Sequence, residues 1–193
     1  MHHRRRHRKP LHASVACVCL LALAGMGAGS ALADDNGSGG AVFIPPPPPP
    51  KKARIWHGRA LAPRSAPRRV RRVIRAANRL IGKPYRYGGG HTAFTSGLAS
   101  GYDCSGSVSY ALHGGRFLRS PLDSSSFADW GRRRPGRWIT VYTNPGHAYL
   151  VVAGLRFDTS MRDPDAPGPR TGPRWSKRLR RSASFLPRHP RGY

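Results

Sequence analysis

Hydrophobic and polar residues repeat with a helical period between Ser65 and Ile81. Spacings of three and four residues place apolar side chains on one face of a helix. Ser65 is suited to cap this helix, Pro67 to its first turn and Gly82 to end it. We expect one packed face and one solvated, arginine-rich face, which is also a candidate polyanion contact. The packed face comprises Val70, Val73, Ile74, Ala77, Leu80 and Ile81.

A second, shorter helix is predicted to begin at Cys104, in the stretch YDCSGSVSYAL. The residues just before and after this cysteine are polar turn formers. Gly114 and Gly115 mark the end of the helix. Its short inner face comprises Val108, Ala111 and Leu112.

A glycine-rich segment, KPYRYGGGH, spans Lys83 to His91 between the two helices. Glycines permit unusual backbone dihedrals and close backbone approach, although a flexible loop has the same composition. The segment from His91 to Tyr102 is a polar, glycine-containing loop.

The run from His147 to Val152 and its return over Phe157 to Ser160 predict a β-hairpin that turns at Ala153 and Gly154. In such a hairpin, His147 and Asp158 lie on one face, as diagonal neighbours within side-chain reach. After it, residues 162–174 are predicted to form a proline-rich surface loop. Apolar residues then indicate that the C-terminus returns to the sheet: Trp175, Phe185 and Leu186.

The N-terminal 33 residues have the pattern of a secretory signal peptide. Residues 1–10 are basic, residues 13–28 are apolar or small, and Ala31-Leu32-Ala33 offers a cleavage site. An uncleaved membrane anchor is the alternative, although the apolar stretch is shorter than the ~20 residues of a membrane span. We expect a secreted protein, extracellular or associated with the cell wall, that meets a membrane only if the signal stays attached.

Residues 34–64 read as a linker and a basic arm ahead of a domain over residues 65–193. The linker contains six consecutive prolines, which favour an extended polyproline helix and act as a spacer.

The chain is strongly basic. Lys and Arg number 34 against 8 Asp and Glu, a formal net charge of +26. Removal of the signal with its five basic residues would leave 29 against 8, or +21. Such a chain attracts polyanions, and export favours wall polymers or anionic lipid over nucleic acid. The sequence carries no zinc-finger spacing, phosphate-binding loop or RNA-binding signature, so we expect no nucleic-acid partner.

Cys104 would be the single cysteine after cleavage, which makes an intrachain disulfide impossible. A thiol at a helix start is a candidate nucleophile, because the helix dipole favours the thiolate. An inert buried cysteine is the alternative. With His147 as base and Asp158 to orient its ring, the chain holds the set needed for thiol catalysis, which requires no metal or cofactor.

PYRYGGG, DCSGSVSYAL and GHAYLVV, in this order, resemble the NlpC family of bacterial cell-wall cysteine peptidases. The similarity covers residues 67–160. It implies a papain-like α+β fold, with the nucleophile helix packed on a small antiparallel sheet. It further implies hydrolysis of peptide bonds in peptidoglycan stem peptides, so that peptidoglycan or another anionic wall polymer is the expected partner.

The resemblance implies Cys104 as the nucleophile and His147 as the base. Asp158 falls near the third polar residue of the family, often a histidine. The Cys104 backbone N–H is a plausible oxyanion donor. The residues expected on the substrate side of the thiol are Tyr85 or Tyr87, Asp103 and Ser105.

The chain also departs from the family pattern. A Gly-Asp-Leu stretch before the histidine is absent, the loop over residues 91–102 is longer than usual, and no wall-binding repeat accompanies the domain. Two other functions stay open: a non-catalytic basic module that binds wall or membrane, and a thiol acyltransferase or amidase on the same scaffold.

Overall fold

The computed structural model describes residues 52–160 and 172–193. The chain divides into two compact units, Met1–Ile44 and Pro45–Tyr193, and every described residue belongs to the second. The predicted signal peptide, the polyproline spacer and most of the proline-rich loop lie outside the described residues.

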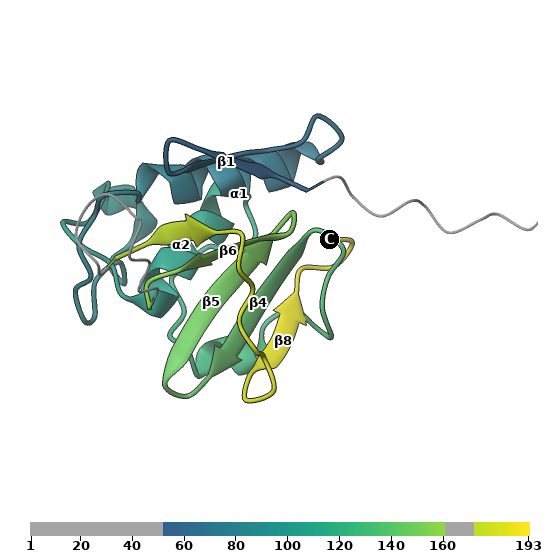
Figure 1. Cartoon of the computed structure of the whole chain (residues 1–193). Coiled ribbons are helices and arrows are strands. Elements are labelled where there is room, and N and C mark those ends of the chain that lie inside the picture. Colours follow the sequence, from purple (N-terminus) through teal and green to yellow (C-terminus); the bar gives the residue numbers. More distant parts are fainter. Residues whose placement is uncertain (1–51, 161–171) are drawn as a thin grey trace, which may run out of the picture. The chain divides into compact units, whose positions relative to one another are not determined.

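Six antiparallel strands form the main sheet, in the order β3-β8-β4-β5-β6-β7 (Figure 1). β4 and β5 are its longest strands and lie at its centre, where β-branched and aromatic residues fill the buried positions. The strands are β3 (Arg132–Arg133), β4 (Ile139–Asn144), β5 (His147–Val152), β6 (Leu155–Asp158), β7 (Arg174–Ser176) and β8 (Leu186–His189).

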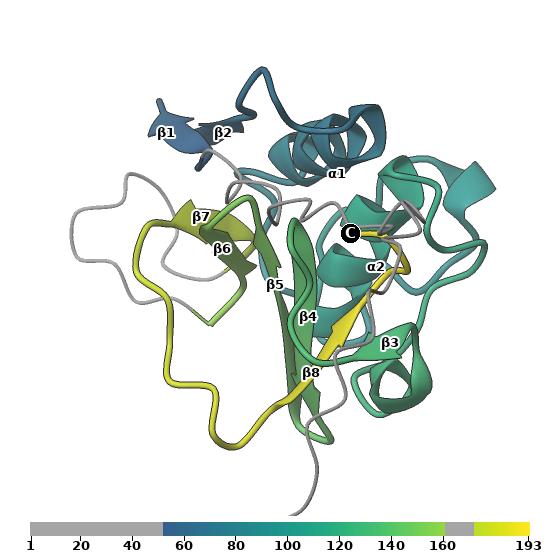
Figure 2. The ribbon, with the colours of Figure 1, turned by 90° about the vertical axis from the view of Figure 1, so that its right-hand side faces the viewer.

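Two α-helices lie on one side of this sheet, α1 (Arg68–Arg79) and α2 (Cys104–Gly114) (Figure 2). α2 packs on β5, and α1 packs on α2. Almost all of α2 is buried, as expected for a helix that lies between a sheet and a second helix. Short 3₁₀ turns follow each helix, η1 (Phe94–Ser96) and η2 (Ser126–Asp129).

The first helix begins two residues later than predicted, with Pro67 in place of Ser65 as its N-cap. Pro67 is its N-cap residue, and its extended ψ of 150° keeps it outside the helix, so Ser65 has no capping role. The predicted packed face is confirmed, since its residues from Val70 to Leu80 are buried. Leu80 is the C-cap, and Gly82 follows with a φ of 88°.

The predicted hairpin and its register are confirmed, but its return strand covers Leu155–Asp158 in place of residues 157–160. β5 and β6 pair with Val152 opposite Leu155, and both turn residues between them have positive φ, 47° at Ala153 and 81° at Gly154. The return of the C-terminus to the sheet is also confirmed. Trp175 is buried in β7 opposite Phe157, and β8 pairs with β4.

The basic arm before α1 contains a hairpin that the sequence pattern did not reveal. β1 (Arg54–Trp56) and β2 (Arg59–Leu61) form a separate two-stranded sheet. The side chain of Asn78 on α1 exchanges two hydrogen bonds of 2.9 Å with the backbone of Ala60, and it accepts a third, of 2.8 Å, from Trp175 Nε1. One half-buried amide therefore joins the hairpin, α1 and β7.

Within the described residues, no helix is long and apolar enough to cross a membrane.

Candidate active site

The thiol of Cys104 lies at the first residue of α2, and the residue is 9% exposed. Asp103 is the N-cap, and its Oδ1 accepts a 2.7 Å hydrogen bond from the Gly106 amide. Among the described residues, none accepts a hydrogen bond from the Cys104 amide, which is one of the unpaired donors at a helix start. This amide can donate to an oxygen that becomes negatively charged beside the thiol.

The glycine-rich loop holds this helix start in place. The Asp103 amide donates to the Gly89 carbonyl, and the Gly88 amide donates to Asp103 Oδ2, both at 3.1 Å. A side chain on Gly106 would collide with the Gly89 carbonyl oxygen. Glycine is therefore required at position 106, because a backbone segment passes directly against the first turn of α2.

His147 is the first residue of β5, and its imidazole interacts with the Cys104 thiol strongly enough to shift the pKa of both groups. Its Nε2 lies 2.9 Å from Asp158 Oδ1, so the other ring nitrogen, Nδ1, serves the thiol. Burial disfavours the imidazolium, but the hydrogen bonds with Asp158 and Cys104 outweigh it and raise the pKa of His147 to about 9.

The interaction between His147 and Cys104 also shifts the pKa of the thiol. Burial opposes the thiolate, yet hydrogen bonds from His147 and from the Ala148 amide outweigh it, and the pKa of Cys104 falls below its ordinary value. A thiolate beside an imidazolium is the arrangement that these two shifts favour together. It supplies a nucleophile and a proton donor in one hydrogen-bonded pair.

The carboxylate of Asp158 is fully buried on β6 and is held by several groups besides His147. Ser160 donates to Oδ1 from its amide at 3.0 Å and from its hydroxyl at 3.1 Å. Arg156 and Arg180 approach Oδ2 at 3.6 and 3.5 Å. Burial would raise the pKa of Asp158, but its hydrogen bonds and the positive charges of His147 and Arg156 keep that pKa below the usual range. The acid therefore stays ionised and fixed in orientation.

Aromatic rings flank the imidazole. Tyr149 is stacked against His147 with ring centroids 6.3 Å apart, and Phe185 meets it edge-on at 6.2 Å. The guanidinium of Arg180 lies over Phe185 at 4.9 Å and over Tyr149 at 5.3 Å. This packing restricts rotation of the imidazole and covers the Asp158 side of the site.

The two candidate tyrosines differ in position. Tyr85 is 40% exposed and forms an isolated bridge with Tyr102, and partial burial first, then the nearby charges of Cys104 and Asp103, raise its pKa. Tyr87 is 94% exposed. The structure therefore brings Tyr85 close to the thiol and directs Tyr87 to solvent.

The side chains of Asp103 and Ser105, which the sequence places on the substrate side of the thiol, form hydrogen bonds within the protein. Both are buried, and the Ser105 hydroxyl contacts Asp103 Oδ1 and His91 Nε2, each at 3.3 Å. His91 Nε2 also lies 3.0 Å from Asp103 Oδ1. The polar groups of these side chains bond to one another and to the loop, and these contacts hold Cys104 in position.

Several residues near the thiol escaped sequence analysis: His91, Ala148, Arg156, Ser160 and Arg180. Arg156 and Ser160 lie two residues either side of Asp158 and so share its face of the strand, a signal that could have identified them. Arg180 lies beyond β7, and no local pattern connects it to the site. The described residues contain no cluster of three or more His, Cys, Asp or Glu side chains that could hold a metal ion.

No protein-family model matches this chain, and no curated protein matches it. Among solved structures, a mutated form of RipA, a Resuscitation Promoting Factor Interacting protein, is similar. The two are 24% identical, with a TM-score of 0.45, and the match covers 74% of this chain and 70% of that one.

Proposed function

We propose that this protein is an exported cysteine peptidase that hydrolyses amide bonds in peptidoglycan stem peptides. The observation that carries the proposal is the hydrogen-bonded set of Cys104, His147 and Asp158, in which the thiol and the imidazole each have a shifted pKa. Shifted ionisable groups that contact one another are typical of catalytic sites.

The proposed reaction has two stages. The Cys104 thiolate attacks the amide carbonyl carbon, and the imidazolium of His147 then gives its proton to the amine, which leaves as the C–N bond breaks. A thioester remains. Water, deprotonated by the now neutral His147, attacks it, and the C–S bond breaks to release a carboxylate and the thiolate. Asp158 stays ionised and stabilises the imidazolium throughout.

Each tetrahedral intermediate places a negative charge on the former carbonyl oxygen. We assign the Cys104 amide as one donor to that oxygen, since it is otherwise unpaired among the described residues. We assign the Tyr85 hydroxyl as a second candidate donor. Its raised pKa keeps it protonated at neutral pH, as a hydrogen-bond donor must be.

The choice of peptidoglycan rests on the combined sequence motifs and on charge. The motifs around Tyr85, Cys104 and His147 resemble those of the NlpC family, whose papain-like domains act on stem peptides. The formal charge of +26 suits a substrate that carries free carboxylates. A secreted location belongs to the same proposal, because peptidoglycan lies outside the cytoplasmic membrane.

The test is direct. The full chain with Cys17→Ala and Cys19→Ala, which leaves Cys104 as its only thiol, is incubated with purified peptidoglycan, and the released fragments are analysed by mass spectrometry. We expect new amine and carboxylate termini, and none when Cys104→Ala is added. Absence of cleavage by the parent chain would overturn the peptidase proposal. Equal cleavage by both would remove Cys104 from the mechanism, and transfer of the acyl group to an added amine in place of water would indicate an acyltransferase.

A further inference from the structure

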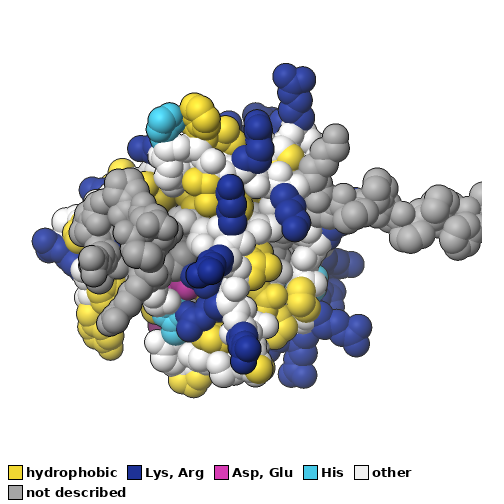
Figure 3. All heavy atoms as spheres, viewed as in Figure 1, with side chains coloured by type: hydrophobic (Ala, Val, Ile, Leu, Met, Phe, Trp, Pro, Cys, Tyr) yellow, Lys and Arg dark blue, Asp and Glu magenta, His cyan; other side chains and the backbone are white. Residues whose placement is uncertain are grey.

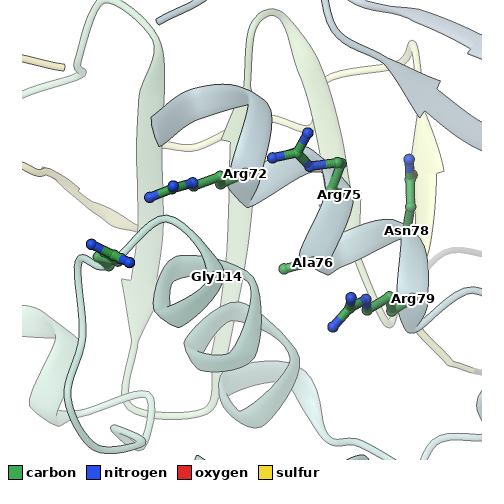
Figure 4. A pocket seen from close by; sticks show the side chains of 7 residues that line it. Arg72, Arg75, Ala76, Asn78, Arg79 and Gly114 are labelled. Atoms are coloured by element: carbon green, nitrogen blue, oxygen red, sulfur yellow. The ribbon is translucent and has the colours of Figure 1, made fainter. Parts of the chain in front are cut away.

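A cavity of about 490 Å³ lies between α1 and the end of α2. Figure 4 shows that Arg72, Arg75 and Arg79 extend from α1 around it, with Ala76 and Gly114 between them. Arg116, just after α2, also lines it. α2 runs from Cys104 to Gly114, so at 1.5 Å per residue this cavity lies ~15 Å along the helix from the thiol.

Small residues form the floor of this cavity because the helices cross there. A side chain on Gly114 would collide with the Ala76 side chain, so only glycine permits this close approach. The long arginine side chains therefore surround Ala76 and Gly114, which carry no polar side-chain group. A charged ligand can approach the guanidinium groups without displacing a packed side chain.

The guanidinium groups around the cavity have no acidic counterpart. None of the ion pairs among the described residues involves Arg72, Arg75, Arg79 or Arg116. Repulsion from Arg68 first, then partial burial and the charges of Arg116 and Arg75, lower the pKa of Arg72. The fold thus gathers like charges, an unfavourable arrangement that an anionic ligand relieves.

Neighbouring Arg69 has a structural role, because its guanidinium bonds to other parts of the fold. Its Nε donates to the Gly115 carbonyl at 2.8 Å, and its guanidinium stacks over the Phe117 ring at 3.9 Å. Its donors therefore already have partners within the protein. Arg72, Arg75 and Arg79 have no such internal contact among the described residues, so their donors are free for a ligand.

The arginines also form a line. Arg68, Arg72, Arg75 and Arg79 follow one another at spacings of four, three and four residues, along one side of α1. These spacings correspond to rises of about 6, 4.5 and 6 Å. Figure 3 shows Lys and Arg side chains spread widely over the face of the domain that it presents, so it is the cavity and the regular spacing that set this group apart.

We propose that this cavity and its arginine line bind successive phosphate groups of a linear polyol-phosphate polymer. Phosphate is favoured over carboxylate because the guanidinium groups that converge on the cavity offer more donors than the two oxygens of one carboxylate can accept. A linear polymer is favoured over a single phosphate because the charges continue along the helix beyond the cavity.

Nucleic acid fits the cavity less well. The residues that line it include no aromatic ring, and the one amide among them, Asn78, is already bound to Ala60 and Trp175. Phe94 and Tyr110 do line an adjoining cavity that shares Arg79 and Arg116, but Phe94 is stacked on His113 with ring centroids 4.0 Å apart, so one face of its ring is already occupied. The arginine-lined cavity itself therefore suits a phosphate backbone better than a base.

The experiment measures binding of the full chain to a fluorescent glycerol-phosphate oligomer of about eight units. Replacement of Arg72, Arg75 and Arg79 by Gln is expected to weaken binding at least about tenfold, because three charge-assisted contacts are lost. The matched control replaces Arg54, Arg132 and Arg133, which are exposed and lie outside the cavity, by Gln. It removes the same net charge, and we expect a loss of less than about threefold.

Two further probes distinguish the source of the phosphate. Single-stranded DNA with the same number of phosphates and phosphatidylglycerol vesicles are each expected to bind more weakly than the oligomer and to respond equally to both triple variants. Equal losses for the oligomer in both triple variants would overturn the proposal. So would tighter binding of DNA or vesicles that depends on the cavity arginines. Thermal unfolding of each variant verifies that the fold is intact.

Discussion

The imidazole of His147 lies 2.9 Å from the buried carboxylate of Asp158, which holds the ring from the neighbouring strand while the other ring nitrogen serves Cys104. Asp158→Asn keeps the shape of the acid but removes its charge. It can also change which nitrogen of the His147 ring carries the proton. We expect the rate of stem-peptide hydrolysis to fall by a factor of about 10² to 10⁴.

Steady-state hydrolysis by Asp158→Asn is compared with that of Asp123→Asn, which removes an exposed acid. The Asp123 side chain bonds within its own turn, to Ser126 and the Ser125 amide, so its replacement should leave the rate within about twofold of the parent. If Asp158→Asn also retained the parental rate, Asp158 would have no part in catalysis.

The pH dependence of the thiol follows from its contact with His147. Because the pKa of Cys104 is lowered, alkylation by iodoacetamide should persist at pH values below those at which an ordinary thiol reacts. His147→Ala removes the hydrogen bond but leaves the burial, so the midpoint of the alkylation profile should move to higher pH. An unchanged midpoint would contradict the pairing of these two residues.

The alkaline limit of activity has a different cause. The imidazolium of His147 must protonate the leaving amine, and it loses its own proton as the pH rises through about 9. We expect kcat/KM to fall through that pH, while alkylation of the thiol, which needs no acid, does not fall. A parallel decline of both rates above pH 9 would point to unfolding, which circular dichroism at the same pH values would detect.

The contact between α2 and the glycine-rich loop sets a limit on side-chain size. Gly106→Ala would place a methyl group against the Gly89 carbonyl oxygen, and backbone atoms cannot swing aside as a side chain can. We expect the free energy of unfolding to fall by about 1–3 kcal/mol, measured by urea denaturation. Gly146→Ala is the matched control. Its Cβ would meet nothing closer than 3.8 Å, so the effect should stay within about 0.5 kcal/mol.

Tyr85 and Tyr87 offer a matched pair of hydroxyl deletions. Tyr85→Phe should lower kcat by about tenfold or more with little change in KM, since a donor to the oxyanion acts mainly in the transition state. Tyr87→Phe, at a position 94% exposed, should leave kcat within about twofold. Equal kinetics for the two variants would exclude the Tyr85 hydroxyl from oxyanion stabilisation.

The local elements of this fold could be predicted from sequence because their signals are local. The packed face of α1 follows from the spacing of Val70, Val73 and Ile74, and the start of α2 follows from the polar turn around Asp103. The alternation of side chains along the two strands of the β5–β6 hairpin predicted that His147 and Asp158 lie on one face. The structure brings them within hydrogen-bond distance.

What the sequence did not reveal depends on contacts between distant segments. The hairpin over residues 54–61 is short, and it is held by Asn78, which lies 18 residues from Ala60. Arg180 reaches Asp158 from beyond the seventh strand. The contacts of Asp103 with Gly106 and His91 were likewise not predicted, because His91 lies 12 residues before the N-cap.

The backbone contact at Ala53 determines where the described part of the domain begins. The Ala53 amide donates to the Ala153 carbonyl at 2.8 Å, at the turn where β5 ends, whereas His147 begins that strand. Six strand residues separate the two ends by about 20 Å. The described part of the domain therefore begins at one end of β5 and carries its candidate catalytic pair at the other, so the first described residues lie remote from the thiol.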